Sequence, residues 1–457
     1  MSNLLKRVYI SAVVVSVFIS QLAKAVEADD VLMLAEKTGH WLASTAVKKA
    51  QGIAWPDNVN KPELQGYDLG SGAAGKVIFF TALYQATGKS FYLTQAKQGA
   101  DYLISLLAQP TYFNSNNRKA SLYNGIAGIG VALMELNHVQ ANEKYHFALE
   151  KIVALLVNWS QVKGKQRHWS DKFNDLLYGD TGTILFLSDY ANQYNAPQAQ
   201  KMAQQGAYFL LSQVQKTEQG GYWFFRRDKA FNLPNFSHGT AGVVYTLATV
   251  GKQSRDKTII NGAIAGVNYL TSIAEIEQET IRFPYGWGSE NWQGLYQFGW
   301  AHGLSGVALT LQQVKQSGIE VKQSEHLLKL IKHTLLNINV AGKVKVPFSE
   351  PSTPLDFRFG RAGVLSLVSH WSRESAGDKK LIKIRDELWA TIARAAIQDD
   401  KSAYWLVDAP AFMGGGKAKY TGLLHGAAGV GMTLLNMHAA MVNKASYVRL
   451  PDDPYSR

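Results

Sequence analysis

A short glycine motif occurs seven times along this chain of 457 residues. In each copy, two glycines separated by two residues precede an apolar segment. The first glycines are spaced 53 to 66 residues apart and are Gly72, Gly125, Gly179, Gly239, Gly303, Gly360 and Gly426. Such a recurrence is the signature of a repeat architecture, and it constrains the fold more than any other feature of the sequence.

Amphipathic segments alternate with the glycine motifs. In "EKYHFALEKIVALLVNW" and "SEHLLKLIKHTLLNINV" the apolar residues recur at steps of three and four, which predicts helices with one buried face. The segments that follow the glycines are apolar on nearly all sides, which predicts helices buried all round. Residues 29–50 supply the first amphipathic helix, so the pattern predicts seven outer and seven inner helices.

The terminal repeats are as apolar as the central ones. An open solenoid normally needs polar caps at its ends, so we expect an all-α (α/α)7 toroid, with an open α-solenoid as the alternative. A single domain over residues 26–457 follows. If the inner helices are parallel, their positively polarised N-termini converge on one mouth, and the residues just before each first glycine line it.

Residues 1–25 have a different pattern. Lys6 and Arg7 precede an apolar run of 15 residues, Val8 to Leu22, and "AKA" ends the segment at Ala25. This run is shorter than the roughly 20 residues of a membrane-spanning helix. We therefore expect a signal peptide, cleaved after Ala25, and a secreted or periplasmic protein with no stable membrane insertion. An uncleaved anchor is the alternative.

The composition excludes several classes of chemistry. The chain has no cysteine, which rules out thiolate metal sites, thiol nucleophiles and redox pairs. The net charge is +12, but the basic residues are scattered, so nothing supports nucleic-acid binding.

The seven motifs resemble the lanthionine synthetase C (LanC-like) family, the cyclases of lantibiotic biosynthesis and their relatives, over essentially the whole mature chain. The resemblance implies a toroid that acts on peptides. Cyclases of the family bind zinc with two cysteines and a histidine, and these positions correspond here to Ala301, Arg358 and Phe359. These residues make poor zinc ligands, so we expect no zinc cofactor and no cyclase chemistry. A shifted site built on His302 stays open.

Other positions of the family pattern are retained. The resemblance implies an acid–base or orienting role for His238 and Asp175, and Trp300 keeps its place in the fifth repeat. His238, His302 and His425 each stand directly before a first glycine. Imidazoles at a pocket mouth suit general acid–base catalysis, and the alternative is that they hydrogen-bond a neighbouring helix start. We assign His238, Asp175 and His302 as candidate catalytic residues, and Trp300 and His425 as candidate binding residues.

Carboxylates also occur near the glycines. Asp68 and Asp175 each precede a first glycine by four residues, and Asp180 follows Gly179 directly. Two carboxylates across a pocket can act as acid and base, and the alternative is that they cap helices. Capping is favoured for Asp68, and Asp180 is a candidate binding residue.

Arginines and tryptophans complete the candidate binding residues. Arg358 and Arg361 flank Gly360 and suit a carboxylate or phosphate, although Arg358 can instead pair with Asp356. Several tryptophans fall in loops before inner helices, where they either rim the mouth or fill gaps between repeats. The rim role is favoured for Trp287 and Trp292, whose loop is rich in glycine and serine.

Three functions remain open. The first is an exported LanC-like protein that binds or modifies peptides without zinc, through His238 and Asp175. The second is a carbohydrate-active enzyme of glycosidase, lyase or epimerase type, with facing carboxyl groups and an oligosaccharide substrate. The third is a non-catalytic binding protein whose mouth is filled by Phe359 and Trp300. Whether the protein is an enzyme stays open.

Overall fold

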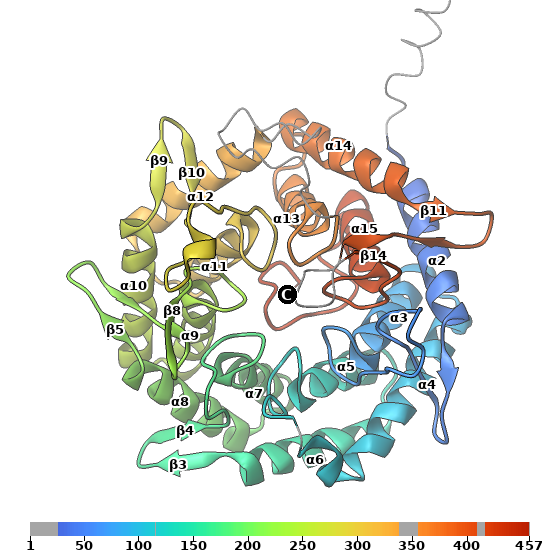
Figure 1. Ribbon diagram of the computed structural model, residues 1–457, viewed down its shortest axis with the longest axis horizontal. Coiled ribbons are helices and arrows are strands. Elements are labelled where there is room, and N and C mark those ends of the chain that lie inside the picture. The colour runs from blue at the N-terminus through green and yellow to red at the C-terminus, as the bar shows by residue number, and fades with distance from the viewer. Residues whose placement is uncertain (1–25, 115, 338–354, 409–415, 457) are drawn as a thin grey trace, which may run out of the picture.

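The computed structural model describes residues 26–114, 116–337, 355–408 and 416–456. The predicted signal segment, residues 1–25, lies outside the described residues. Fourteen helices of the described chain form two concentric rings (Figure 1). The inner ring comprises α3 (Ala73–Thr87), α5 (Ile126–Val139), α7 (Asp180–Tyr194), α9 (Thr240–Ser254), α11 (Leu304–Gln316), α13 (Arg361–Glu374) and α15 (Ala427–Met441). The outer ring comprises α2 (Ala28–Ser44), α4 (Ser90–Leu107), α6 (Glu143–Trp159), α8 (Pro197–Ser212), α10 (Lys257–Ser272), α12 (Lys322–Leu336) and α14 (Lys379–Ala395).

The rings are closed. The last inner helix, α15, packs against α13 on one side and against α3 on the other, and it also contacts α2. Backbone hydrogen bonds close a second ring at the N-terminal ends of the inner helices, through the residue two positions before each first glycine. These seven bonds span 2.8 to 3.2 Å and run from Gly70 to Tyr123, Leu177, Ser237, Ala301, Arg358, Leu424 and back to Gly70. The predicted (α/α)7 toroid is confirmed, and the open solenoid is wrong.

The glycine pairs have distinct roles in packing. Each first glycine is the N-cap of its inner helix, in an extended conformation. Each second glycine lies where the preceding loop and the neighbouring repeat meet. A Cβ at Gly306 would lie 2.2 Å from the carbonyl oxygen of Trp300 and 2.5 Å from Cβ of Phe236. Only glycine permits this approach, so the motif specifies the contact between adjacent repeats.

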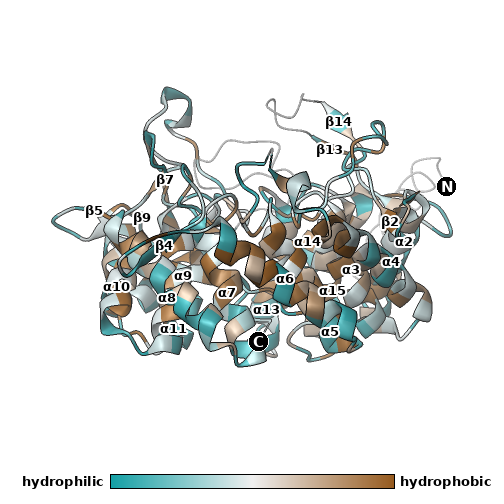
Figure 2. Ribbon diagram, turned by 90° about the horizontal axis from the view of Figure 1, so that it is seen from below, coloured by the Kyte–Doolittle hydropathy of each residue, from teal (hydrophilic) through white to brown (hydrophobic). Residues whose placement is uncertain are grey.

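Short hairpins and two 3₁₀ turns connect the helices on the face that carries the mouth (Figure 2). The hairpins were not predicted, because strands of two to four residues have no readable period. They pair β1 (Val47–Lys48) with β2 (Ile53–Ala54), β3 (Gln161–Lys163) with β4 (Gln166–His168), β5 (Gln215–Lys216) with β6 (Gly221–Tyr222), β7 (Phe224–Arg226) with β8 (Lys229–Asn232), β9 (Glu275–Glu277) with β10 (Thr280–Arg282), β11 (Ile397–Gln398) with β12 (Ala403–Tyr404), and β13 (Val407–Asp408) with β14 (Lys417–Ala418). The 3₁₀ turns are η1 (Pro110–Phe113) and η2 (Glu290–Trp292).

Four tryptophans fill the gaps between the rings. The indole Nε1 of each donates to the carbonyl oxygen thirteen residues earlier, at the end of an outer helix. The pairs are Trp55 with Leu42, Trp169 with Leu156, Trp223 with Leu210 and Trp405 with Ile392, at 2.7 to 3.0 Å. These tryptophans therefore have the repeated structural role that was the alternative to a role at the rim.

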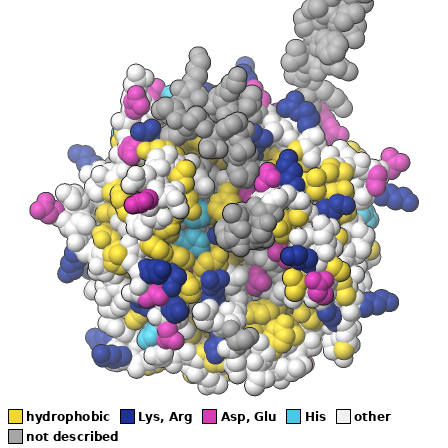
Figure 3. Space-filling view, in the orientation of Figure 1, with side chains coloured by type: hydrophobic (Ala, Val, Ile, Leu, Met, Phe, Trp, Pro, Cys, Tyr) yellow, Lys and Arg dark blue, Asp and Glu magenta, His cyan; other side chains and the backbone are white. Residues whose placement is uncertain are grey.

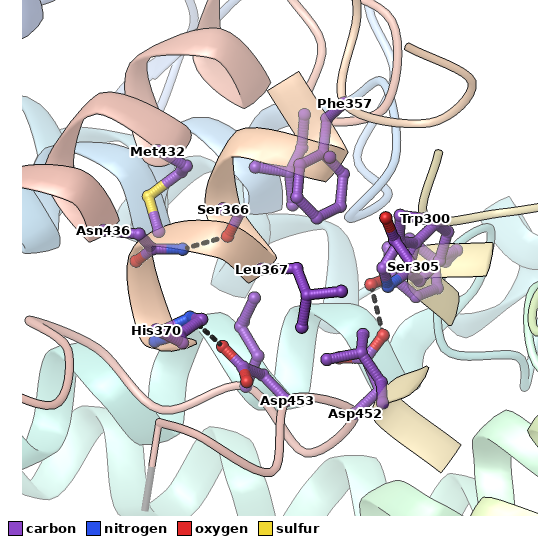
Figure 4. A pocket seen from close by; sticks show the side chains of 15 residues that line it. Trp300, Ser305, Phe357, Ser366, Leu367, His370, Met432, Asn436, Asp452 and Asp453 are labelled. Carbon is purple, nitrogen blue, oxygen red and sulfur yellow. Dashed lines mark hydrogen bonds and ion pairs between the residues drawn. The ribbon is translucent and has the colours of Figure 1, made fainter. Parts of the chain in front are cut away.

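The C-terminal segment occupies the opposite end of the toroid from the mouth (Figure 2). The Tyr123 hydroxyl donates to Asp452 Oδ2 at 2.6 Å, and Trp371 Nε1 donates to the Tyr455 hydroxyl at 2.7 Å. A cavity of about 40 Å³ remains between this segment and the side chains of Trp300 and Phe357 (Figure 4). This cavity has room for only a few water molecules. None of the described helices is long and apolar enough to cross a membrane.

Candidate functional site

The loop before each inner helix places its last residues at defined depths. The residue three before the first glycine points into the packed centre. Trp300 is one of these: it is 3% exposed, and its ring lies 5.5 Å from Phe236 and 5.6 Å from Phe357. Trp300 therefore lies in the floor beneath the mouth. The residue directly before the glycine lies above the floor, and this position carries His238, His302 and His425. Figure 3 shows histidine side chains at the centre of this face.

A buried chain of five polar side chains crosses the centre of the mouth. Asp175 Oδ2 lies 2.6 Å from His238 Nδ1, and His238 Nε2 lies 3.0 Å from Arg358 Nη2. The other end of the same guanidinium continues the chain, with Arg358 Nη1 3.0 Å from His425 Nε2 and His425 Nδ1 3.3 Å from Asp356 Oδ2. One arginine thus joins two aspartate–histidine pairs from the third, fourth, sixth and seventh repeats. Arg358 reaches Asp356 through His425, and no direct ion pair between them occurs in the described structure.

The hydrogen bonds define the protonation of both imidazoles. A guanidinium has only donors, so Nε2 of His238 and Nε2 of His425 must accept. The ring proton of each then lies on Nδ1 and is donated to Asp175 or Asp356. Burial lowers the pKa of His238 well below its ordinary value, and His302, Arg358 and Arg118 add to the effect. Burial also raises the pKa of Asp175 well above its ordinary value. His238 is therefore a neutral imidazole, and its Nε2 lone pair accepts a hydrogen bond from Arg358.

His302 has the opposite tautomer. The Asn235 side chain accepts the backbone N–H of His238 through Oδ1, at 2.9 Å, so its Nδ2 faces His302 Nδ1 at 2.9 Å. Nδ1 of His302 must accept, and the ring proton lies on Nε2. The ring stacks between Tyr285, at 4.8 Å and 11°, and Phe359, at 5.3 Å and 20°. Burial lowers the pKa of His302 well below its ordinary value, and Arg358 and His425 add to the effect.

The residues at the family's zinc positions do not fit a metal ion. Ala301 is fully buried in the ring of backbone hydrogen bonds, and Phe359 stacks on His302. The guanidinium of Arg358 lies between the two imidazole nitrogens that would otherwise face a metal, and its positive charge repels one. Within the described residues, no three histidine, aspartate or glutamate side chains are grouped so that they could hold a metal ion. His302 is therefore not part of such a group in the described structure.

Three further candidate residues lie outside this chain. Asp180 is fully buried at the start of α7, where it accepts from Trp169 N at 2.6 Å and pairs with Arg227 at 2.9 Å. Asp68 accepts from Ser71 N at 2.8 Å and so caps the turn before α3, while Gly72 is the N-cap of the helix itself. Arg361 is half-buried at the first position of α13, and burial lowers its pKa.

Most N–H groups at the described helix starts are already hydrogen-bonded to the preceding loop. In the fourth repeat, the backbone N–H of Thr240 donates to Leu233 O at 2.9 Å, and that of Ala241 donates to Pro234 O at 3.1 Å. Both bonds recur in four of the other six repeats, and one of the two is present in the second and sixth repeats. The expected convergence at one mouth is correct, but loop carbonyls already occupy the donors that would bind a ligand.

Aromatic side chains lead from the rim to the site. Trp287 is 43% exposed, whereas Trp292 is partly buried against Phe231, at 5.2 Å, and Tyr285, at 5.7 Å. Tyr285 in turn stacks on His302. The two predicted rim tryptophans therefore flank one side of the mouth, where hydrophobic and basic side chains surround the histidines (Figure 3).

Sequence reasoning missed Asn235, Tyr285 and Arg118. Asn235 had a readable signal, because it precedes its first glycine by four residues, as Asp68, Asp175 and Asp356 do. Tyr285 and Arg118 lie in irregular loops of unequal length. No repeat register identifies them, and only the folded loops place them beside the histidines.

Comparisons with known proteins agree with this architecture. A family model described as lanthionine synthetase C-like protein matches residues 63–446. None of the curated protein sequences matches the chain. Among solved structures, nisin cyclase superposes with a TM-score of 0.59 at 13% identity, over 92% of this chain and 95% of the cyclase.

Two other solved structures are less similar. An unsaturated glucuronyl hydrolase from Bacillus sp. GL1 has a TM-score of 0.44 at 11% identity, over 68% of this chain and 83% of its own. An α-1,6-mannanase from Salegentibacter sp. HEL1_6 has a TM-score of 0.44 at 12% identity, over 78% of this chain and 99% of its own. The identity to nisin cyclase is low enough that the likeness concerns the fold, while the family model spans most of the sequence. The chain belongs to the lanthionine synthetase C-like family.

Proposed function

We propose that this protein binds a peptide segment at the mouth of the toroid and acts on it without zinc. The observation that carries the proposal is the position of Arg358, whose guanidinium joins the Asp175–His238 and Asp356–His425 pairs. A fixed guanidinium can donate to a peptide carbonyl or carboxylate oxygen and stabilise negative charge that develops there. This stabilisation by the guanidinium requires no metal ion.

The same geometry suggests how His238 becomes available. In the described structure the Nε2 lone pair of His238 is taken up by Arg358 Nη2. A ligand oxygen that accepts from this Nη2 releases Nε2, and Asp175 holds the ring in the tautomer that can take a proton. Ligand binding and activation of the base are therefore coupled in this proposal.

Two alternatives have specific support. Trp287 is an exposed aromatic face at the rim, as a sugar-binding cleft requires. A glycosidase, lyase or epimerase would also use free carboxyl groups, but Asp175 and Asp356 each contact an imidazole and Asp180 contacts Arg227. A non-catalytic binding role is supported by His238 and His425, because both ring nitrogens of each already have a hydrogen-bond partner. Neither imidazole can act as a base until a ligand displaces one of these partners.

A paired binding screen tests the proposal. A random peptide library and a glycan array are probed with the wild-type chain, with His238→Ala and with the control His146→Ala. His146 is on the surface of α6, where it pairs with Glu150. We expect peptides to bind the wild type and the control, and binding to fall in His238→Ala. Glycan binding alone, or peptide binding that His238→Ala leaves unchanged, would contradict the proposal.

Two measurements separate its parts. Mass spectrometry of the bound peptides after incubation distinguishes modification from binding alone. Modification changes the mass of the peptide or its ratio of deuterium to hydrogen, and binding alone changes neither. Metal analysis of the purified protein should find no stoichiometric zinc, and a chelator should leave peptide binding unchanged.

We also propose that the chain is exported after cleavage at Ala25, because of the charged and apolar pattern of residues 1–25. N-terminal sequencing of the mature protein should begin at Val26. A mature protein that retains Lys6 and Arg7 would show that the segment is an anchor.

A further inference from the structure

Arg118 lies at the edge of the mouth, in the loop between η1 and α5. Its guanidinium covers the ring of Tyr178, at 4.0 Å from the centroid, and lies 5.1 Å from the ring of Phe173. Tyr178 directly precedes Gly179, and its ring is 4.9 Å from the ring of His238. The charge of Arg118 acts on both His238 and Asp175. Arg118 is therefore a second cation beside the Asp175–His238 pair, separate from Arg358.

The guanidinium of Arg118 has no acceptor in the described part of the chain. Nearby arginines do: Arg226 pairs with Asp228 at 2.6 Å and Arg227 with Asp180 at 2.9 Å. By contrast, no hydrogen bond or ion pair joins the Arg118 side chain to a described residue, and its Nε is buried without a partner. Stacking on Tyr178 uses the face of the guanidinium and leaves its N–H edge free.

Three carboxylates of the mouth already have partners. Asp175 contacts His238 and Asp356 contacts His425, while Asp180 contacts Arg227. A buried charged donor without an acceptor is costly, and a planar guanidinium edge matches a carboxylate in two parallel hydrogen bonds. A carboxylate supplied by a ligand would give this guanidinium edge the acceptor that the described residues do not provide. The net charge of +12 favours its approach.

We propose that Arg118 is the subsite for a carboxylate group of the bound peptide, which is either an acidic side chain or the free C-terminus. This inference rests on the proposed function and specifies its substrate class as carboxylate-bearing peptides. The carboxylate binds edge-on to the guanidinium over Tyr178. The adjoining peptide unit then lies next to His238 and Arg358, so Arg118 sets which part of the peptide meets the central pair.

Small probes test the subsite directly on the full chain. Protein with ¹⁵N-labelled arginine is titrated with N-acetylglycine, which carries an α-carboxylate, and with N-acetylglutamic acid α-amide, which carries a side-chain carboxylate. N-acetylglycinamide is the neutral control. We expect a carboxylate probe to shift the Nε–H resonance of Arg118, identified by its loss in Arg118→Gln, while the neutral amide does not. The probe with the larger effect identifies the source of the carboxylate.

Variants connect the subsite to peptide binding. For an acidic peptide from the screen, Arg118→Gln should weaken binding about 10-fold or more, because a charge-assisted hydrogen bond is lost. Arg118→Lys, which keeps the charge but not the planar fork, should weaken it less. Arg226→Gln is the matched control and should change binding less than about 2-fold, because Arg226 already pairs with Asp228.

The outcomes separate the two proposals. If no carboxylate probe shifts Arg118, or if Arg118→Gln binds the acidic peptide as the wild type does, the subsite is wrong while peptide binding can stand. If the probes shift Arg118 but no peptide binds at the mouth, the carboxylate subsite stands and the proposed function is wrong.

Discussion

Replacing Arg358 with methionine should turn His238 into a titrating histidine. In the wild-type structure, burial is the main cause of its lowered pKa, and the positive charges of Arg358 and Arg118 contribute. Arg358 Nη2 lies 3.0 Å from Nε2, the atom that would take the proton. Methionine approximates the aliphatic part of arginine but removes both the charge and the donor.

The magnitude follows from the distance. With a guanidinium centre about 4 Å from Nε2, two unit charges repel by about 4 kcal/mol at an effective dielectric constant of about 20. Arg358→Met removes this repulsion, so the pKa of His238 should rise. Asp175 lies 2.6 Å from Nδ1 and remains to pair with the imidazolium, while burial persists. We therefore expect the pKa of His238 to rise toward that of an ordinary histidine.

Nuclear magnetic resonance of the histidine ring nitrogens provides the assay. The wild type should show His238 as an Nδ1–H tautomer that does not titrate near neutral pH, and Arg358→Met should show His238 gaining a proton. The control is Arg385→Met, which removes a largely buried arginine of α14 that pairs with Asp386. A wild-type His238 in the Nε2–H tautomer, or one that stays unprotonated in Arg358→Met, would refute the reasoning.

Three further predictions concern packing, the rim and pH. Gly429→Ala should destabilise the fold by about 3 kcal/mol or more in urea unfolding, because its Cβ would lie 1.9 Å from a backbone oxygen. Gly88→Ala should cost about 1 kcal/mol, because Gly88 has a φ of +69° but no atom within 4 Å of the added Cβ. Equal losses would contradict this account. Trp223→Phe should cost about 1–3 kcal/mol by stranding a buried carbonyl, while Trp287→Ala should leave stability unchanged and weaken ligand binding; the reverse pattern would remove Trp287 from the rim site. His302 stays neutral in the folded protein but is protonated in the unfolded protein below a pKa of about 6.5, so the free energy of unfolding should fall as the pH drops below 6.5. His302→Gln should reduce this slope by about 1.4 kcal/mol per pH unit. Urea titrations at several pH values measure the slope.

Part of the site was readable from the repeat register. His238, His302, His425 and Asp175 occupy fixed places relative to the glycines, and the structure brings all four to one mouth. What they contact was not readable, because Asp175 and His238 are 63 residues apart and His238 and Arg358 are 120 residues apart. Contacts of this range depend on how the loops of different repeats meet.

Asp180 and Trp300 show the limit of register more clearly. Each stands at a motif position, yet Asp180 fixes a loop through Arg227 and Trp300 fills the floor under the mouth. A shift of two or three residues along the same loop moves a side chain from the mouth into the packed centre. The register gives the position along the loop, but the direction of the side chain depends on the backbone path.

The sequence alone determined the number of helices, their division into two rings and the replacement of the family's zinc-ligand positions by Ala301, Arg358 and Phe359. Glycine spacing and apolar periodicity are local properties of the sequence. The methyl side chain of Ala301 has no atom that can coordinate zinc, whether the chain is folded or not. Only the tertiary structure decided that Arg358 joins two histidines, that the pKa of His238 is lowered, and that Nε of Arg118 is buried without an acceptor. Protonation and pairing depend on burial and on distances of a few ångströms between repeats, and these exist only once the ring has closed.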